Sequence, residues 1–425
     1  MISYSSSHHH DRRLGVVAAG FLIGTFQLVG RSYFGQFMGS EAVAWYLQLR
    51  LLVLAVLSIW LLGVAAARGP GAIRSFAGGV RAWSAVFVVF VAYMVATTLW
   101  APDLPLAAAK AYDLMYVAWS CVLTVAALRL CGIGSTIRGF WYAIFAWGVV
   151  LAVAGVASVF ANPSLERLSV MGGGPNVFGR NMGLLTLAAL RIAFQSSRPW
   201  GRFFGLMVVP FGSFLVLLSG SRGALLALLF GAITYAAIRG LDRRVWVTLL
   251  LAASAGGALL FTELGSRAIS VFATRFIRLL LIEGYTSNRG VLLVDGVVAG
   301  LGSPLGGIGL AGFAQLDTFG LYPHNVFVEA FAEGGVIGLL LFCLPLLVFI
   351  TRCRSGHGLG DPAITAALVL LLTSSSISGD LFDARGVFVL LLIALATQST
   401  LSGAPTVRTR IRLPPRPYPQ LPGTP

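Results

Sequence analysis

The chain has 425 residues, of which 57% are hydrophobic and 11% are charged, and its mean hydropathy is +0.87. This composition excludes an ordinary water-soluble globular protein. The formal net charge is +15, from 30 Lys and Arg against 15 Asp and Glu. In so apolar a chain, the positive excess favours membrane orientation and contact with anionic lipid over nucleic-acid binding.

Apolar runs of about 20 residues recur along the whole chain. Because only helices satisfy their own backbone in lipid at this length, the sequence predicts an all-α polytopic membrane protein. We expect about twelve transmembrane helices, at residues 14–30, 43–67, 83–101, 106–130, 139–160, 179–195, 203–219, 222–238, 245–262, 325–350, 363–380 and 385–401.

The distribution of charge predicts the orientation. If the amino terminus is cytoplasmic, every inner segment carries at least two arginines, and most acidic residues fall outside. Positive charge in short loops fixes topology, so both termini are predicted to be cytoplasmic. Residues 1–13 then form a cytoplasmic tail, residues 14–402 the transmembrane domain, and residues 403–425 a disordered, basic, Pro-rich cytoplasmic tail.

Two predicted helices begin with an arginine on the outer side. Arg180 lies in GGGPNVFGRNM (172–182), and Arg222 lies in SGSRG (219–223) after two serines that could cap the helix. A helix amino terminus attracts anions, and a guanidinium binds phosphate oxygens bidentately. Each arginine is therefore a candidate phosphate ligand, although an interfacial arginine that only reaches lipid headgroups would show the same pattern.

Residues 263–323, between the ninth and tenth helices, form one large extracytoplasmic loop. Its first part, SRAISVFATRFIRLLLI (266–282), has the spacing of an amphipathic helix at the membrane interface. Arg289 in TSNRG (286–290) begins a short helical stretch, and SPLGGIGLAGF (303–313) is Gly-rich and turn-like. The loop is too apolar for a free linker, so we expect it to pack back over the helices, and loops of this length are usually functional.

Residues 322–341, YPHNVFVEAFAEGGVIGLLL, predict a turn that leads into a membrane helix. His324 is suited to general-base chemistry near neutral pH, and as an imidazolium it could equally stabilise a departing phosphate. Glu329 and Glu333 share a helical face with Asn325, a predicted cap. A lone histidine is often structural, however, and the glutamates could simply pair with nearby arginines. The glycines at 334, 335 and 338 are expected to allow close helix packing.

No metal or cofactor is predicted. The sequence has no phosphate-binding loop, dinucleotide fingerprint or metal-ligand motif, and its four cysteines lie in or beside apolar runs. Asp380 and Asp383 either line the same cavity as the other polar residues or hydrate a tight turn beside Arg385.

Three segments together resemble a known family. The run PHNVFVEAFAEGGVIGLLLF resembles the signature of the bacterial O-antigen ligase and O-antigen polymerase superfamily. SGSRG resembles the Ser-x-x-Arg-Gly helix start of that family, and TSNRG followed by SPLGGIGLAGF resembles its arginine helix and Pro-x-x-Gly-x-Gly turn. The resemblance covers residues 172–342 with specific motifs.

The resemblance implies a GT-C-like integral-membrane glycosyltransferase that needs neither metal nor cofactor. Its donor would be an undecaprenyl-pyrophosphate-linked glycan, and an acceptor hydroxyl would displace the pyrophosphate at the outer face of the bacterial plasma membrane. His324 and Glu329 would be catalytic, and Arg222, Arg289 and Arg180 would bind pyrophosphate. The expected partners are the donor, a glycan or lipid-glycan acceptor and the bilayer, with no nucleic acid.

Two other classes stay open from the sequence. A transporter or flippase for an anionic or lipid-linked substrate would also use membrane arginines and interrupted helices. A scaffold for a cell-envelope assembly is a further alternative. Within the leading class, the sequence does not separate a ligase from a polymerase.

Overall fold

The computed structural model describes residues 7–29, 48–69, 85–161, 167–170, 174–240, 254, 257–258, 261–282, 288–316 and 322–402. The longer helices among them are α1 (Ser7–Val29), α3 (Leu49–Arg68), α5 (Ala85–Ala96), α6 (Leu104–Leu130), α7 (Ile133–Ala161), α8 (Pro175–Gln195), α9 (Pro199–Leu218), α10 (Arg222–Arg239), α12 (Glu263–Phe272), α13 (Arg289–Gly302), α14 (Val326–Arg352), α15 (Pro362–Ser378) and α16 (Arg385–Ser402). Shorter 3-10 or π-helical turns are η2 (Thr97–Trp100), η3 (Ala273–Ile282), η4 (Gly312–Gln315) and η5 (Cys353–His357).

The described part of the chain is helical, as the sequence predicts. Seven of its helical segments are long and apolar enough to cross a membrane: α3, α6, α7, α8, α9, α10 and the segment Val326–His357. Four shorter apolar helices accompany them: Val17–Val29, Ala85–Trp100, Pro362–Ser378 and Arg385–Gln398. The predicted helix at 245–262 and the predicted tail at 403–425 lie almost entirely outside the described residues.

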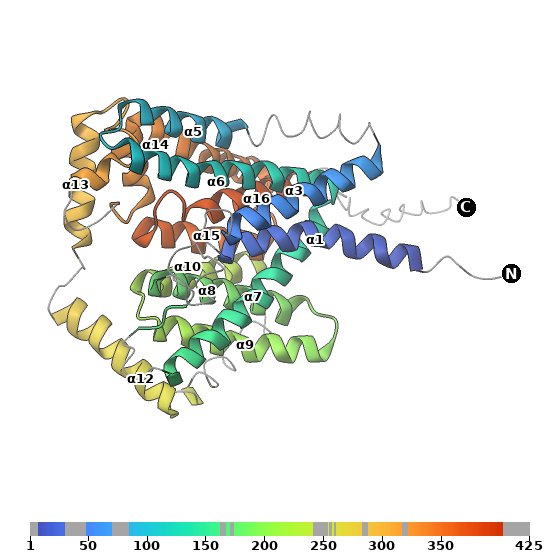
Figure 1. Cartoon of the computed structure of the whole chain (residues 1–425). Coiled ribbons are helices and arrows are strands. Elements are labelled where there is room, and N and C mark those ends of the chain that lie inside the picture. The colour runs from blue at the N-terminus through green and yellow to red at the C-terminus, as the bar shows by residue number, and fades with distance from the viewer. Residues whose placement is uncertain are drawn as a thin grey trace, which may run out of the picture.

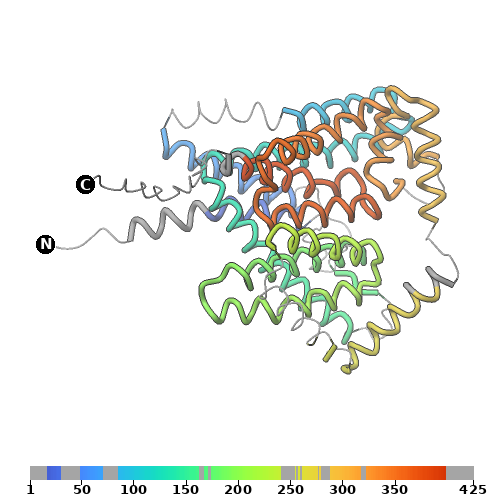
Figure 2. Tube along the Cα trace, turned by 180° about the vertical axis from the view of Figure 1, so that it is seen from behind, coloured from blue at the N-terminus to red at the C-terminus, as the bar shows by residue number. Residues whose placement is uncertain are grey.

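The hairpin of α15 and α16 occupies the centre of the bundle. Helix α15 packs on α8 and α10, whereas α16 packs on α6 and α14, so the hairpin joins two groups of helices (Figure 1). Helices α12 and α13 lie at the opposite end of the bundle from the first residues of α1, and the view from behind shows the same separation (Figure 2). The turn between α15 and α16 therefore brings its polar residues into the middle of the molecule.

Helix α14 is broken inside its apolar run. Gly335 has φ 63° and ψ −164°, so the helical hydrogen-bond ladder stops there. The Gly-rich segment 303–313 fills the break, because its backbone bonds to the freed groups on both sides. These bonds are Ile308 N–H to Ala332 O (2.9 Å), Gly309 N–H to Glu333 O (3.2 Å), Val336 N–H to Pro304 O (2.8 Å) and Ile337 N–H to Leu305 O (3.5 Å).

This break differs in part from the sequence prediction. Gly334 and Gly338 do pack closely against Met94 and Tyr93 of α5, as expected of small residues in a membrane bundle. Gly335 instead permits the left-handed backbone at the break, where a Cβ would lie 2.3 Å from Leu305 O. Non-helical backbone at membrane depth is tolerated only where protein satisfies it, and segment 303–313 does so.

The fit of segment 303–313 can be tested with two neighbouring glycines. A Cβ at Gly307, where φ is +70°, would lie 2.4 Å from the Glu333 carbonyl carbon, whereas a Cβ at Gly306 would make an ordinary 3.4 Å contact with Trp100. We expect Gly307→Ala to lower the free energy of unfolding by at least about 1–3 kcal/mol because of backbone strain, and Gly306→Ala to have little effect. Thermal unfolding of the solubilised variants measures the difference, and equal stability would contradict the proposed fit.

Candidate active site at one end of the bundle

His324 lies in the turn that starts α14. Its backbone is left-handed, with φ 57°, an uncommon conformation for a side chain-bearing residue. Asn325 caps the helix, because its Oδ1 accepts from the N–H of Phe327 (3.0 Å) and of Val328 (3.2 Å). The Tyr322 ring meets the His324 ring edge to face at 4.5 Å between centroids. The helix cap at Asn325 and the edge-to-face contact with Tyr322 together orient the His324 imidazole.

The surroundings of His324 favour its neutral form. Burial lowers the pKa of His324 below its usual value, and the positive charge of Arg289 lowers it further, while Asp380 and Asp383 oppose the shift. Nδ1 is buried and has no hydrogen-bond partner among the described residues. A neutral imidazole with an unused nitrogen can accept a proton from a substrate, which a structural histidine with both nitrogens bonded could not do.

Four arginines gather beside this turn: Arg167, Arg222, Arg275 and Arg289. Burial and, after it, the positive charges of the other three arginines lower the pKa of Arg167 to about 10. The hydrogen bonds of Arg167 go to the backbone carbonyls of Ser219 (Nε, 3.2 Å) and Gly220 (Nη2, 3.4 Å). Like charges this close disfavour one another, so an anion bound among them would be strongly stabilised.

Local structure places each of these arginines. Arg222 is the first residue of α10, where the predicted cap is confirmed: Ser221 Oγ accepts from Ala224 N–H at 3.3 Å. Gly220, with φ +61°, lies against Arg167, so the turn before α10 brings the two arginines together. Arg275 lies on η3, which continues the amphipathic helix α12 that the sequence predicts.

Arg289 connects the arginine cluster to the central hairpin. It is the first residue of α13, after Asn288 in a left-handed conformation, and it donates to Ile377 O (3.2 Å) and Ser378 Oγ (3.3 Å) at the end of α15. Burial and Arg222 lower the pKa of Arg289. The structure thus brings Arg222, Arg289 and His324 to one place.

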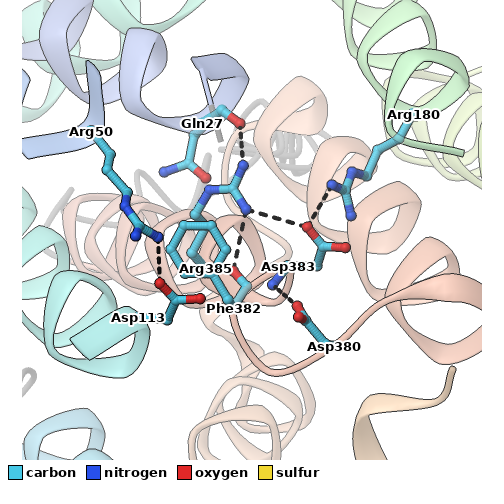
Figure 3. A network of polar contacts seen from close by, with 8 residues as sticks. All are labelled: Gln27, Arg50, Asp113, Arg180, Asp380, Phe382, Asp383 and Arg385. Atoms are coloured by element: carbon cyan, nitrogen blue, oxygen red, sulfur yellow. Dashed lines mark hydrogen bonds and ion pairs between the residues drawn. The ribbon is translucent and has the colours of Figure 1, made fainter. Parts of the chain in front are cut away.

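Arg180 occupies a different position from the other predicted anion ligands. It is buried on α8 and donates to Asp383 Oδ1 at 2.9 Å, and Asp383 also contacts Arg385 Nη1 at 3.4 Å (Figure 3). Asp380 Oδ1 accepts from Asp383 N–H at 2.7 Å, which fixes the turn between α15 and α16. Arg180 therefore holds this turn, with Tyr322 and Asp380 among its electrostatic neighbours.

The same turn is anchored on its other side. Arg385 donates to Phe382 O (3.2 Å) and to Gln27 O on α1 (3.0 Å). The Phe382 ring lies beneath two guanidinium groups, those of Arg385 (4.5 Å to the centroid) and Arg50 (5.2 Å), and Arg50 pairs with Asp113 (Figure 3). The turn is therefore contacted by α8 at Asp383, by α1 at Arg385 and by α3 at Phe382, and Arg50 links it to Asp113 on α6.

Glu329 and Glu333 share one cation, Lys110 on α6. Lys110 Nζ lies 2.5 Å from Glu329 Oε1, and 2.7 Å from both oxygens of Glu333. Both glutamates are fully buried. Lys110 therefore bridges the two carboxylates in one buried group. The sequence predicts arginine partners here; the actual partner is Lys110, the single lysine of the chain.

A cavity of about 890 Å³ adjoins this group. Its lining includes Lys110, Glu329, Asp380 and Tyr322, but not Asp383. Of the two aspartates, Asp380 therefore lines a cavity, while both belong to the tight turn beside Arg385. Sequence reasoning missed Lys110 and Arg167. An ionisable residue near the start of a membrane helix was the available signal for Lys110, whereas Arg167 lies in a connecting segment with no motif around it.

The buried ion pairs of Lys110 can be tested by charge removal. Lys110→Met leaves two buried carboxylates without their cation, and we expect it to lower the free energy of unfolding by about 3–5 kcal/mol. Adding Glu329→Gln and Glu333→Gln to the same protein should recover most of the loss. Unfolding of the three proteins in detergent measures this, and a Lys110→Met protein as stable as the parent would show that the pairs are unimportant.

The electrostatic coupling between Arg289 and His324 can also be measured. Because Arg289 holds the pKa of His324 down, Arg289→Gln should move the His324 titration upward, towards the ordinary value of about 6.5. Diethyl pyrocarbonate modifies neutral imidazole, so its reaction at His324, followed by mass spectrometry against pH, reports the shift. Arg354→Gln, in η5 beyond the far end of α14, is the control and should leave the titration in place.

The comparisons with known proteins agree with this geometry. Residues 206–343 match the family model described as O-antigen ligase, and this stretch contains Arg222, Arg289, His324 and Glu329. No curated protein matches the chain. Over these residues the chain is similar to the O-antigen ligase family.

Proposed function

We propose that the protein transfers a glycan from undecaprenyl pyrophosphate to an acceptor hydroxyl at the outer face of the plasma membrane. The observation that carries the proposal is the arginine cluster next to a histidine whose neutral form is favoured. This arrangement places a binding site for the anionic pyrophosphate leaving group beside a base for the acceptor hydroxyl. The family match supports a ligase-type enzyme that acts on a lipid-linked glycan.

The arginine cluster stabilises the leaving group. As the acceptor oxygen bonds to the anomeric carbon, the bond from that carbon to the phosphate oxygen breaks, and negative charge grows on the pyrophosphate. Arg167, Arg222 and Arg289 are already oriented by hydrogen bonds or by a helix start, so they need little rearrangement as the charge develops. Arg180 contributes by holding Asp383 and the central turn.

His324 accepts the proton of the acceptor hydroxyl. The imidazole is neutral near pH 7 because burial and Arg289 disfavour its charged form, and a neutral imidazole has one ring nitrogen free to accept a proton. Glu329, fully buried beside Lys110, helps to orient the acceptor rather than to take the proton. This proposal assigns no step to a metal ion or cofactor.

The arginine distribution along the sequence supports the orientation. With both termini in the cytoplasm, the site faces outwards, where nucleotide sugars are not expected and a lipid-borne donor is required. A transporter is less well supported, because the charged residues gather at one end of the bundle and the family match is to a ligase. A deletion strain would distinguish a ligase, whose loss removes attached polymer, from a polymerase, whose loss leaves single-unit chains.

The pyrophosphate role is tested with the two arginines at opposite ends of α10. In liposomes that contain the lipid-linked glycan and acceptor, Arg222→Gln should lower the release of undecaprenyl pyrophosphate by roughly a hundredfold, as the loss of one charge-stabilising donor does elsewhere. Arg239→Gln, at the last residue of the same helix, should retain activity. Equal rates of undecaprenyl pyrophosphate release in the two variants would contradict the role of the arginine cluster in binding pyrophosphate.

The role of His324 is tested by substitution and by pH. His324→Gln should lower the rate by roughly a hundredfold or more, because general-base catalysis contributes about that much. In the unmodified protein, the rate should fall as pH drops through the lowered pKa of His324, below about 6.5. Full activity in His324→Gln, or a rate that does not change down to low pH, would contradict the role of His324 as general base.

A further inference from the structure

We propose that the cavity lined by Lys110, Glu329 and Asp380 is the binding site for the acceptor saccharide. This inference rests on the proposed function and adds to it the place and the chemical class of the second substrate. The cavity measures about 890 Å³, which lies within the range of sites that enclose small organic ligands, about 300–1,000 Å³. A short oligosaccharide fits a space of this size.

The lining chemistry suits a neutral sugar. Carboxylates accept hydrogen bonds from sugar hydroxyls, and Asp113, Glu329 and Asp380 all line the cavity. Tyrosine rings offer flat apolar faces for the C–H side of a sugar ring together with a phenolic hydroxyl, and Tyr112, Tyr116 and Tyr322 supply them. The two cations of the lining, Arg50 and Lys110, are paired with Asp113 and Glu329, so the lining has three carboxylates against two cations and attracts the donor pyrophosphate less than the arginine cluster does.

Glu329 points to a ligand in particular. Its side chain is fully buried and lines the cavity, and Lys110, the cation against it, is shared with Glu333. A carboxylate has about four acceptor sites, whereas an ammonium group divided between two carboxylates has three donors. Hydroxyl groups of a bound sugar would fill the remaining acceptor sites of Glu329.

The acceptor site and the donor site lie on different sides of the contacts that His324 makes. Tyr322 lines the cavity and its ring touches that of His324, whereas none of the four clustered arginines lines the cavity. The charge of Arg289 interacts electrostatically with both Tyr322 and His324. The His324 turn is thus the common neighbour of a carboxylate-lined cavity and a cluster of positive charge. Direct displacement requires the attacking oxygen and the leaving group to flank the reacting carbon, and two separate sites that share the His324 turn are the arrangement which this reaction needs.

Two adjacent alanines on α6 give a matched test, because both are exposed but only Ala109 lines the cavity. The photoreactive residue p-benzoylphenylalanine is placed at Ala109 or at Ala108 of the full chain, and the producing cells are irradiated. Mass spectrometry of the purified protein should find a saccharide without polyprenyl pyrophosphate attached at position 109 and not at 108. A captured polyprenyl-pyrophosphate glycan, a phospholipid or no adduct at 109 would each overturn the proposal.

Kinetics provide the second measurement. In liposomes that contain the full chain, lipid-linked glycan and acceptor glycan extracted from the same cells, Ala109→Trp should raise the KM for acceptor at least about tenfold and leave the KM for donor unchanged. Ala108→Trp should change neither. A raised KM for donor, or no change, would contradict the acceptor assignment. If the parent protein releases no polyprenyl pyrophosphate, the proposed function fails, and the capture experiment still decides whether the cavity holds a saccharide.

Discussion

The break in α14 is the constraint on which the site depends. An apolar helix that stops at Gly335 leaves carbonyl and amide groups without partners, and in a membrane bundle such groups must be satisfied by protein. Segment 303–313 satisfies them, and it follows α13 directly, so the break fixes the loop that carries Arg289 against the half-helix that carries Glu329. Backbone hydrogen bonding thereby joins the predicted anion ligand and the predicted acid residue into one unit.

The charged residues at this end of the bundle fall into two kinds. Three groups of opposite charges are in contact and hold together helices that are distant in sequence. They are Arg180 with Asp383, Arg50 with Asp113, and Lys110 with its two glutamates. The arginine cluster is different, since the groups that act on Arg167 are other arginines. Paired charges are weak evidence for function. Like charges gathered in one place are costly in the free protein, so they indicate an anionic ligand.

Much of the fold could be predicted because apolar runs of membrane length have few structural solutions. The predicted spans overlap described helices, apart from the one at 245–262, which lies almost entirely outside the described residues, and seven of these helices are long enough to cross a membrane. The caps at Ser221 and Asn325 could be predicted too, since capping is a local property. The partner of Glu333 could not, because Lys110 lies 223 positions away and a pattern on one helix does not reveal the register of another. In the sequence, Gly335 looks like Gly334 and Gly338, which pack against α5. Its different role, at the break in α14, becomes apparent only from the path of segment 303–313.

The central claim is that pyrophosphate binds among the arginines while a separate cavity receives the acceptor. A cryo-EM structure of the full chain in a lipid nanodisc, bound to an undecaprenyl-pyrophosphate-linked glycan, tests it most directly. The account predicts phosphate density in contact with the guanidinium groups of Arg167, Arg222 and Arg289, with the first sugar next to His324 and the cavity beside Lys110 free of phosphate. Phosphate density beside Lys110, or away from all of the clustered arginines, would contradict it.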